Sequence, residues 1–235
     1  MRLYQPPPAP LEMLLHGLSF SHDLGPWRNF LESSSELCER ICLDRYIMIL
    51  NRLLNHRLYD CSVLDLGCSS GFFSYAFAVT AASQVTGVED ERAMKFGYDE
   101  RAFLRPLREV KEHYRLDHLE IVGQSIENFL EQQAWRRSWD VVLCLSVLHH
   151  FRTGYGDCPG DGQLGADDLT RLYERLGAVT RRVLYLEVDE TRIGDERQFF
   201  SELCQSGGFD PPVALGYSCS APGVPRTVWE LSRKK

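Results

Sequence analysis

The sequence lacks several features that would place it in whole classes of protein. None of its apolar runs approaches the roughly 18 residues that a helix needs to span a bilayer. Prolines interrupt the opening MRLYQPPPAP, which breaks the apolar core that a signal peptide would need. We therefore expect a cytoplasmic protein with no membrane span.

Cysteine is present, but not in the patterns that hold metals. The chain has 8 cysteines, and none of them forms a C-x-x-C pair. Clusters of Cys and His at the spacing of a zinc site are also missing. These thiols are therefore interpreted as reduced, and we expect no metal.

Basic residues are outnumbered, with 26 Lys and Arg against 33 Asp and Glu and a net charge of −7. Nucleic-acid binding depends on neutralising phosphates with basic side chains, so this balance makes nucleic acid an unlikely partner. A possible basic patch keeps an RNA-modifying enzyme as an alternative; it is formed by Arg105, Arg108, Lys111 and Arg115. Nothing in the sequence indicates an oligomeric state.

What is present fits one α/β domain with an added segment, because the chain has 235 residues and ordinary globular composition. Strand-like segments are predicted at 61–67, 84–89, 119–123, 182–190 and from 140 to Leu145-Ser146-Val147. Helices are predicted at 72–82, 91–115, 125–133, 166–180 and 195–209, and two more strands surround a turn at Pro222-Gly223. This alternation predicts βαβ units in a mostly parallel sheet with an antiparallel tail. Residues 1–59 are predicted to form an N-terminal extension, with a helix from Pro26 to about Asn55, that covers the ligand-binding site, and 60–235 are predicted to form the main domain.

The most informative segment is VLDLGCSSGFFS, residues 63–74, where a strand enters a glycine-containing turn and then a helix. Gly67 permits a sharp turn, and Gly71 permits close approach of a ligand or tight packing. Asp65 ends the strand, and Ser69 stands where the dinucleotide pattern G-x-G-x-x-G has its second glycine. No Gly-Lys-Ser/Thr follows, which excludes a Walker loop.

Further candidate residues follow the next strands. Glu89 closes a strand 18 residues after Gly71, where an acidic side chain accepts the ribose hydroxyls of an adenosine-type ligand. Gln124, Ser125 and Ile126 follow another strand and are interpreted as flanking adenine, although Ser125 also fits a helix cap. A further strand ends near Leu145 and Ser146. The carboxyl ends of parallel strands share one edge, where open α/β sheets bind ligands.

These motifs resemble class I S-adenosylmethionine-dependent methyltransferases. The resemblance rests on DLGCSSG, GVE, WDVVLCLSVLHH and VLYLEV and covers roughly residues 60–232. It implies S-adenosyl-L-methionine as cofactor and a Rossmann-like sheet of seven strands, with the last strand antiparallel and helices on both faces. It also implies that Asp65, Gly67, Ser69, Gly71, Glu89, Gln124, Ser125, Ile126, Leu145 and Ser146 bind the cofactor.

A closer resemblance is to the methyltransferase domain of bacterial O-antigen chain-terminating methyltransferase–kinases. It rests on LDLGCxxGFFS, LSVxHH, the helix before LYLE and a terminal Pro225-Arg226. It implies methylation of a terminal phosphate on a polysaccharide, although the acceptor of this chain need not be the same. The tRNA wobble-uridine carboxymethyl transferases share part of the pattern.

The expected activity is methyl transfer to an oxygen of a small-molecule or glycan-type acceptor, either a hydroxyl or a phosphate. His149 and His150 are the catalytic candidates, because imidazole is suited to removing a proton at neutral pH. Candidate acceptor-binding residues are Arg152, Arg197, Arg226 and Tyr46. The loop 152–166 is rich in glycine and is either a lid over the acceptor or a plain insertion. A non-catalytic module with the same fold is a second alternative.

Overall fold

The computed structural model describes residues 36–58, 60–69, 71–90, 104–154, 162–220 and 224–234. Four predicted segments lie wholly or partly outside these residues: the start of the N-terminal helix, the first part of the helix 91–115, the centre of the loop 152–166 and the turn at Pro222-Gly223. Within the described part of the chain, no helix is long and apolar enough to cross a membrane.

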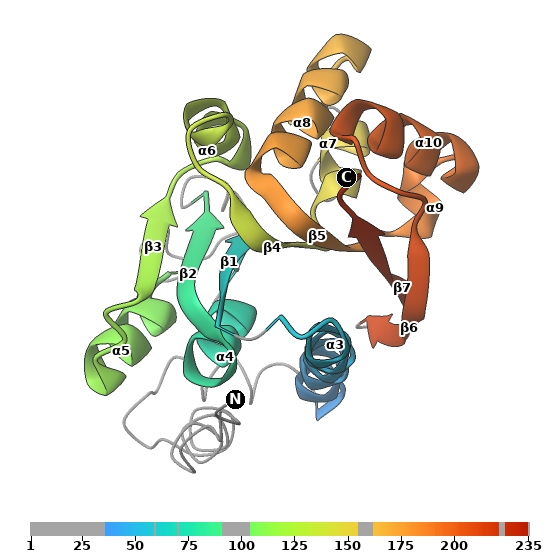
Figure 1. Ribbon diagram of the computed structural model, residues 1–235. Helices are drawn as coiled ribbons and strands as arrows, with labels where there is room; N and C mark the ends of the chain where they lie inside the picture. Colours follow the sequence, from blue (N-terminus) through green and yellow to red (C-terminus); the bar gives the residue numbers. More distant parts are fainter. Residues whose placement is uncertain are drawn as a thin grey trace.

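A single seven-stranded sheet runs through the molecule in the order β3-β2-β1-β4-β5-β7-β6 (Figure 1). Its strands are β1 (Cys61–Leu66), β2 (Ala82–Glu89), β3 (Leu119–Gly123), β4 (Trp139–Leu145), β5 (Thr180–Glu187), β6 (Val213–Ser220) and β7 (Val224–Ser232). The pairs among β1 to β5 are parallel, whereas β7 lies antiparallel between β5 and β6. The predicted seven-stranded sheet with an antiparallel last strand is confirmed.

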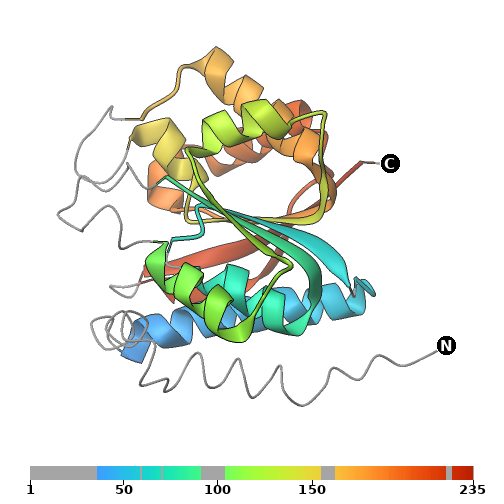
Figure 2. The ribbon, with the colours of Figure 1, turned by 90° about the vertical axis from the view of Figure 1, so that its left-hand side faces the viewer.

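Helices cover both faces of the sheet (Figures 1 and 2). One face carries α3 (Glu36–Asn55), α4 (Phe72–Thr80) and α5 (Arg105–Tyr114). The other carries α6 (Ile126–Gln133), α8 (Ala166–Val179) and α10 (Glu196–Gly207). Two short helices, α7 (Leu148–Thr153) and α9 (Glu190–Ile193), follow β4 and β5.

Two cores result because the side chains of a strand alternate between faces. Val141 and Leu143 of β4 are buried on the α4 side, while Val142 and Cys144 are buried with α6, α8 and α10. Burial on both faces explains why the central strands are continuous apolar runs. It also leaves only the strand ends for polar chemistry.

The segment after β4 differs from the prediction. The strand ends at Leu145, and the two histidines lie in α7 instead of following a longer strand. Ser146 adopts a positive φ of 61°, which turns the chain out of the sheet. Similarly, β5 ends at Glu187 and is followed by α9, which the strand pattern of 182–190 does not reveal.

Helix α3 is tied to the sheet by a buried carboxylate. Glu230 of β7 is 2% exposed and accepts bonds from Arg52 Nε and Nη2 at 2.9 and 3.1 Å. It also lies 3.1 Å from His56 Nε2 and accepts from the Tyr185 hydroxyl at 3.2 Å. A buried charge is tolerated when it is paired and hydrogen-bonded in this way. The described part of the N-terminal extension is therefore fixed against the main domain.

A close approach of α8 and α10 generates a stability prediction. A Cβ added to Gly177 would lie 2.0 Å from the carbonyl oxygen of Gly207, so the two helix backbones must move apart. We expect Gly177→Ala to lower the free energy of unfolding by about 1–3 kcal/mol, despite the better helix propensity of alanine. Urea denaturation measures this change. Gly165→Ala is the control, because its Cβ would meet only Asp168 Oδ2 at 3.9 Å; an equal loss in both variants would contradict the packing argument.

Candidate active site

The turn between β1 and α4 is built around backbone that requires glycine. Gly67 has φ of +70° and Gly71 has φ of +88°, a region that side chains rarely adopt. A Cβ on Gly67 would also lie 2.5 Å from Val147 Cγ2, so the turn after β1 touches the turn after β4. These two turns meet where the strand order reverses, which is the ligand-binding position in open α/β sheets.

The N-terminus of α4 has no side-chain hydrogen bond as a cap. In its first turn the backbone N–H of Ser74 donates to the Asp65 carboxylate, and the helix dipole favours negative charge at this end. The amides of Gly67 and Cys68 are instead used to bind the carbonyl oxygen of Val88, at 2.9 and 3.0 Å. These bonds fix the turn against the end of β2.

Asp65 of β1 is buried and hydrogen-bonded to the first turn of α4. Its side chain is 2% exposed, and Oδ2 accepts a bond of 2.7 Å from the hydroxyl of Ser74 in α4. Burial raises the pKa of Asp65 to about 6, although the bonds from Ser74 act in the opposite direction. The carboxylate thus links β1 to α4, and a direct bond to the cofactor stays a prediction.

Glu89 lies at the end of β2, beside the same turn. Its Oε2 accepts from the amide of Ser69 at 2.7 Å, and its Oε1 accepts from the amide of Asp90 at 3.1 Å. Ser69 has φ of +53°, which aims its N–H at the carboxylate. Burial raises the pKa of Glu89 to about 7, while these two amide bonds lower it. A carboxylate has about four lone-pair positions, so Glu89 retains acceptor capacity for a ribose.

The residues after β3 have mixed roles. Ser125 is the N-cap of α6 and accepts from the amide of Asn128 at 3.3 Å, as the helix-cap interpretation predicts. The amide of Gln124 binds the carbonyl oxygen of Glu89 at 3.0 Å, which holds this segment beside β2. Ile126 is buried at 6% exposure, near Gly67. Contact of these three residues with adenine stays a prediction.

Glu187, which the sequence reasoning missed, is a buried carboxylate with several partners at the end of β5. Glu187 is 1% exposed, and it accepts from Arg226 Nη1 at 3.1 Å and from the Ser146 hydroxyl at 2.9 Å. It also pairs with Arg45 of α3. The signal in the sequence was a charged residue at the end of the apolar strand VLYLE. Leu145 precedes this cluster and is packed in the core at 8% exposure.

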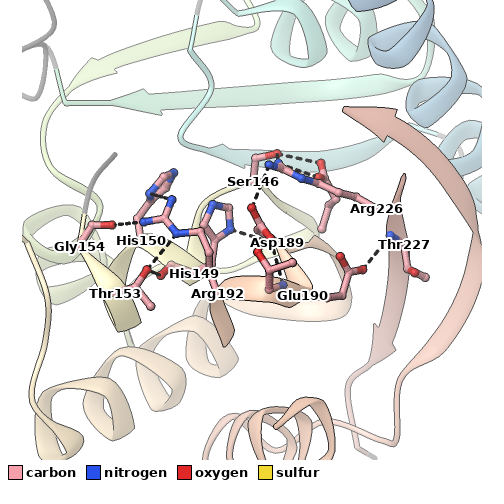
Figure 3. A network of polar contacts seen from close by, with 12 residues as sticks. Ser146, His149, His150, Thr153, Gly154, Asp189, Glu190, Arg192, Arg226 and Thr227 are labelled. Carbon is pink, nitrogen blue, oxygen red and sulfur yellow. Dashed lines mark hydrogen bonds and ion pairs between the residues drawn. The ribbon is translucent and has the colours of Figure 1, made fainter. Parts of the chain in front are cut away.

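The two histidines lie close together in α7, with ring centroids 4.2 Å apart. His149 is 2% exposed, and its Nδ1 accepts from the backbone N–H of Asp189 at 3.2 Å (Figure 3). His150 Nδ1 lies 3.4 Å from Nη1 of Arg192, a residue that the sequence reasoning also missed. Burial lowers the pKa of His149 to about 3, and His150, Arg226 and Arg192 add to this effect.

The structure brings only one of the predicted acceptor-binding arginines to this cluster. Arg226 lies 3.0 Å from Ser146 Oγ and 3.4 Å from Asp189 Oδ2. Arg152 instead points toward α10, where its Nη1 donates to Glu202 at 2.9 Å and its guanidinium lies over Phe199. Arg197 is exposed on α10.

Tyr46 is buried in the core, and its contact with the acceptor stays a prediction. It is 2% exposed, its ring packs edge-on against Phe72 and Phe77, and its hydroxyl bonds to Thr80. The helical spacing that placed Tyr46 in α3 put it on the buried face. Within the described residues, no group of three or more His, Cys, Asp and Glu is arranged to hold a metal.

Comparisons with known proteins agree with this geometry. Residues 64–157 match a family model described as a methyltransferase domain. The fold resembles the bifunctional kinase-methyltransferase WbdD, with 24% identity, a TM-score of 0.60 and coverage of 81% of this chain and 39% of that chain. This chain therefore spans about two fifths of the length of WbdD.

Two further structures are similar over much of the chain. One is magnesium protoporphyrin IX methyltransferase (ChlM) from Synechocystis PCC 6803 with bound SAM, with 13% identity, a TM-score of 0.60 and coverage of 95% of this chain and 91% of that chain. The other is EvdMO1, with 19% identity, a TM-score of 0.55 and coverage of 81% and 41%. A search of curated protein sequences finds no significant match. Residues 64–157 are therefore similar to a methyltransferase domain, and the seven-stranded sheet shares the fold of these methyltransferase structures.

Proposed function

We propose that the protein methylates an oxygen of a small-molecule or glycan-type acceptor, at a hydroxyl or a phosphate. One observation carries the proposal: the glycine turn after β1 touches the turn after β4, and β4 leads directly into the His149–His150 pair. A cofactor held at the first turn and an acceptor held at the histidines would therefore be neighbours. The similarity to WbdD and the resemblance of the motifs to methyltransferase–kinases support an oxygen acceptor.

The cofactor would be held by three kinds of group. They are the glycine turn that contains Gly67, the positive end of the α4 helix dipole, and the remaining acceptor positions of Glu89. S-adenosylmethionine supplies a methyl group on a positively charged sulfur, which an aligned nucleophile displaces in line. The protein's share is alignment and exclusion of water.

Cationic groups beside the histidines favour an acceptor with negative charge or developing negative charge. Arg226 and Arg192 both lower the pKa of His149 and of His150, so their positive potential reaches this position. Guanidinium also matches the geometry of phosphate and carboxylate oxygens.

An acceptor screen tests the proposal directly. Purified protein is incubated with S-adenosylmethionine and panels of hydroxylated glycans, sugar phosphates and small phenols, and release of S-adenosylhomocysteine is measured. We expect turnover with a member of these panels and none with tRNA. Turnover confined to tRNA, or salt-dependent tRNA binding that accompanies it, would overturn the proposal in favour of an RNA-modifying enzyme.

Loss of the Glu89 carboxylate should weaken cofactor binding. Hydrogen bonds to a charged group contribute about 1.5–3 kcal/mol, so we expect Glu89→Ala to reduce the affinity for S-adenosylmethionine by roughly 10- to 100-fold in titration calorimetry. Glu120→Ala is the matched control, because Glu120 is a partly exposed carboxylate of the neighbouring β3 that pairs with Arg137. Wild-type affinity in Glu89→Ala would refute the assignment of Glu89 to the ribose.

The raised pKa of Glu89 predicts that the affinity for the cofactor depends on pH. The pKa of Glu89 is raised to about 7, and only its ionised form accepts two ribose hydroxyls. The affinity for S-adenosylmethionine should therefore be highest above pH 8 and about tenfold lower at pH 6. Calorimetry across this range measures the change. The Glu89→Gln variant should bind S-adenosylmethionine more weakly, and its affinity should not change with pH between 6.5 and 8. If the affinity of this variant varies with pH as in the wild type, another group is responsible for the titration.

A further inference from the structure

The edge of the sheet opposite the candidate site carries an exposed tryptophan and several exposed cations. The candidate site lies at the carboxyl ends of the parallel strands, near α7 on the left of Figure 2. The opposite edge, on the right of that view, is where β4 and β5 begin and where β7 ends. We call this region the basal surface and define it by Trp135, Arg136, Arg181, Arg182 and Lys234.

Hydrogen bonds join the three segments that form the basal surface. The strands β4 and β5 are paired in parallel, so the residues at their starts are adjacent. Arg181 Nη2 donates to the carbonyl oxygen of Ser138 at 3.1 Å, and the backbone N–H of Arg233 donates to the carbonyl oxygen of Arg182 at 2.7 Å. The loop before β4, the start of β5 and the end of β7 therefore form one continuous surface.

Trp135 is the most exposed large apolar side chain in the described part of the chain, at 81%. It follows α6 and has φ of +69°, a conformation that residues other than glycine rarely adopt. The amides of Arg136 and Arg137 both bind the carbonyl oxygen of Gln133, at 2.9 and 3.1 Å, which fixes this turn. Trp139, four residues later, is 0% exposed. The backbone thus holds one indole in solvent, where it adds nothing to the core.

One carboxylate serves two arginines of the basal surface. Asp140 Oδ1 lies 3.1 Å from Arg181 Nη1 and 3.5 Å from Arg182 Nε, and these two arginine side chains are 54% and 59% exposed. Burial acts to raise the pKa of Asp140, but bonds from Ser62 and the charge of Arg181 outweigh it and hold the pKa below its ordinary value. With Asp140 ionised, this group of three residues still carries a net positive charge.

The remaining cations of the basal surface add to this charge. Arg136 and Lys234 are exposed, and neither is paired with a carboxylate among the described residues. The flanking charges include equal numbers of both signs: Arg57, Arg137 and Arg175 are basic, and Asp60, Glu120 and Glu131 are acidic. The basal surface is therefore positive beyond its own immediate ion pairs.

This positive surface contrasts with the chain as a whole, which has a net charge of −7. Such an asymmetry directs an anionic partner to one edge of the molecule. Strand β4 has 7 residues that each advance about 3.3 Å, so the basal surface lies roughly 20 Å from the end of β4 that leads into the histidines. A partner bound here is therefore separate from an acceptor bound at the candidate site.

We propose that the basal surface binds the surface of an anionic lipid bilayer. Tryptophan is suited to the bilayer interface, because its ring is largely apolar while its N–H remains polar. Basic side chains beside it are attracted to anionic headgroups over about a Debye length. The basal surface has a single aromatic side chain, which favours a bilayer over single-stranded nucleic acid, because such strands are bound through several stacked aromatics.

Binding of this kind is peripheral and leaves the candidate site open. No helix in the described part of the chain could cross a bilayer, so contact is restricted to the headgroup region. One indole and a few cations predict weak, reversible binding. The candidate site at the opposite edge of the sheet faces away from the bilayer, and the proposal holds or fails independently of the proposed function.

Flotation with lipid vesicles tests the proposal on the full-length protein. We expect binding to vesicles of phosphatidylglycerol and phosphatidylcholine at low salt, and none to vesicles of phosphatidylcholine alone. Trp135→Ala should weaken this binding by roughly tenfold and Arg136→Gln by about fivefold, because each variant removes one contact with the bilayer. Concentrated salt should release the protein, since it screens the attraction. Absence of binding by the wild type would refute the proposal.

Two matched variants serve as controls for the position of the contact. Tyr217→Ala removes an aromatic side chain that is 76% exposed but lies on β6, and Arg197→Gln removes an exposed arginine of α10. Both variants should bind the mixed vesicles as the wild type does. All the substituted side chains are exposed or held outside the core, so thermal unfolding should stay unchanged. Equal losses in the control variants and in Trp135→Ala would show that the basal surface is not the binding surface.

Tryptophan fluorescence identifies the residue that enters the interface. We expect the emission to shift to shorter wavelengths when the mixed vesicles are added, because the indole of Trp135 leaves water. Trp139 is 0% exposed and should not contribute to this shift. The shift should be absent in Trp135→Phe, and its persistence there would contradict the proposal. Preferential binding of single-stranded RNA that Trp135→Ala weakens would overturn it in favour of a nucleic-acid surface.

Discussion

The buried carboxylate of Glu187 is the constraint on which the polar cluster at the end of β5 depends. At 1% exposure it must be neutralised, and its partners come from three other elements: Arg45 of α3, Ser146 after β4 and Arg226 of β7. An unpaired charge at this depth would be strongly destabilising. The requirement to satisfy one side chain therefore fixes the N-terminal helix, the end of β4 and the antiparallel strand relative to one another.

The two sides of the site follow different physical rules. Around the turn after β1, where we propose that the cofactor binds, backbone conformation dominates, because Gly67 and Gly71 have positive φ and the Ser69 amide donates to Glu89. Around the proposed acceptor position, charges dominate, because arginines from α3, α9 and β7 contact Glu187 or a histidine. This division explains why the first turn has a recognisable local sequence, whereas the second cluster is assembled from distant segments.

The same division decides how much could be predicted from the sequence. The turn at Gly67, the strand ending at Glu89 and the antiparallel tail were all predicted, because local spacing and alternating polarity determine them. The partners of Tyr46 and Arg152 could not be predicted, because helical spacing alone does not reveal which neighbour a side chain meets; these partners, Thr80 and Glu202, lie 34 and 50 residues away. Glu187 and Arg192 were missed for the same reason, and α7 and α9 are too short to carry a periodic pattern.

Imidazole chemistry is the property least accessible from a motif. The sequence His149-His150 at a strand end suggests a base because free imidazole titrates near neutrality. What a histidine does, however, depends on which nitrogen its neighbours occupy, and here one neighbour is a backbone amide, whose presence no side-chain identity encodes. Because α9 follows β5 immediately, its capping residue presents that amide to α7 as a consequence of the fold. The role of the pair is therefore set by chain geometry around the histidines and only secondarily by the histidines themselves.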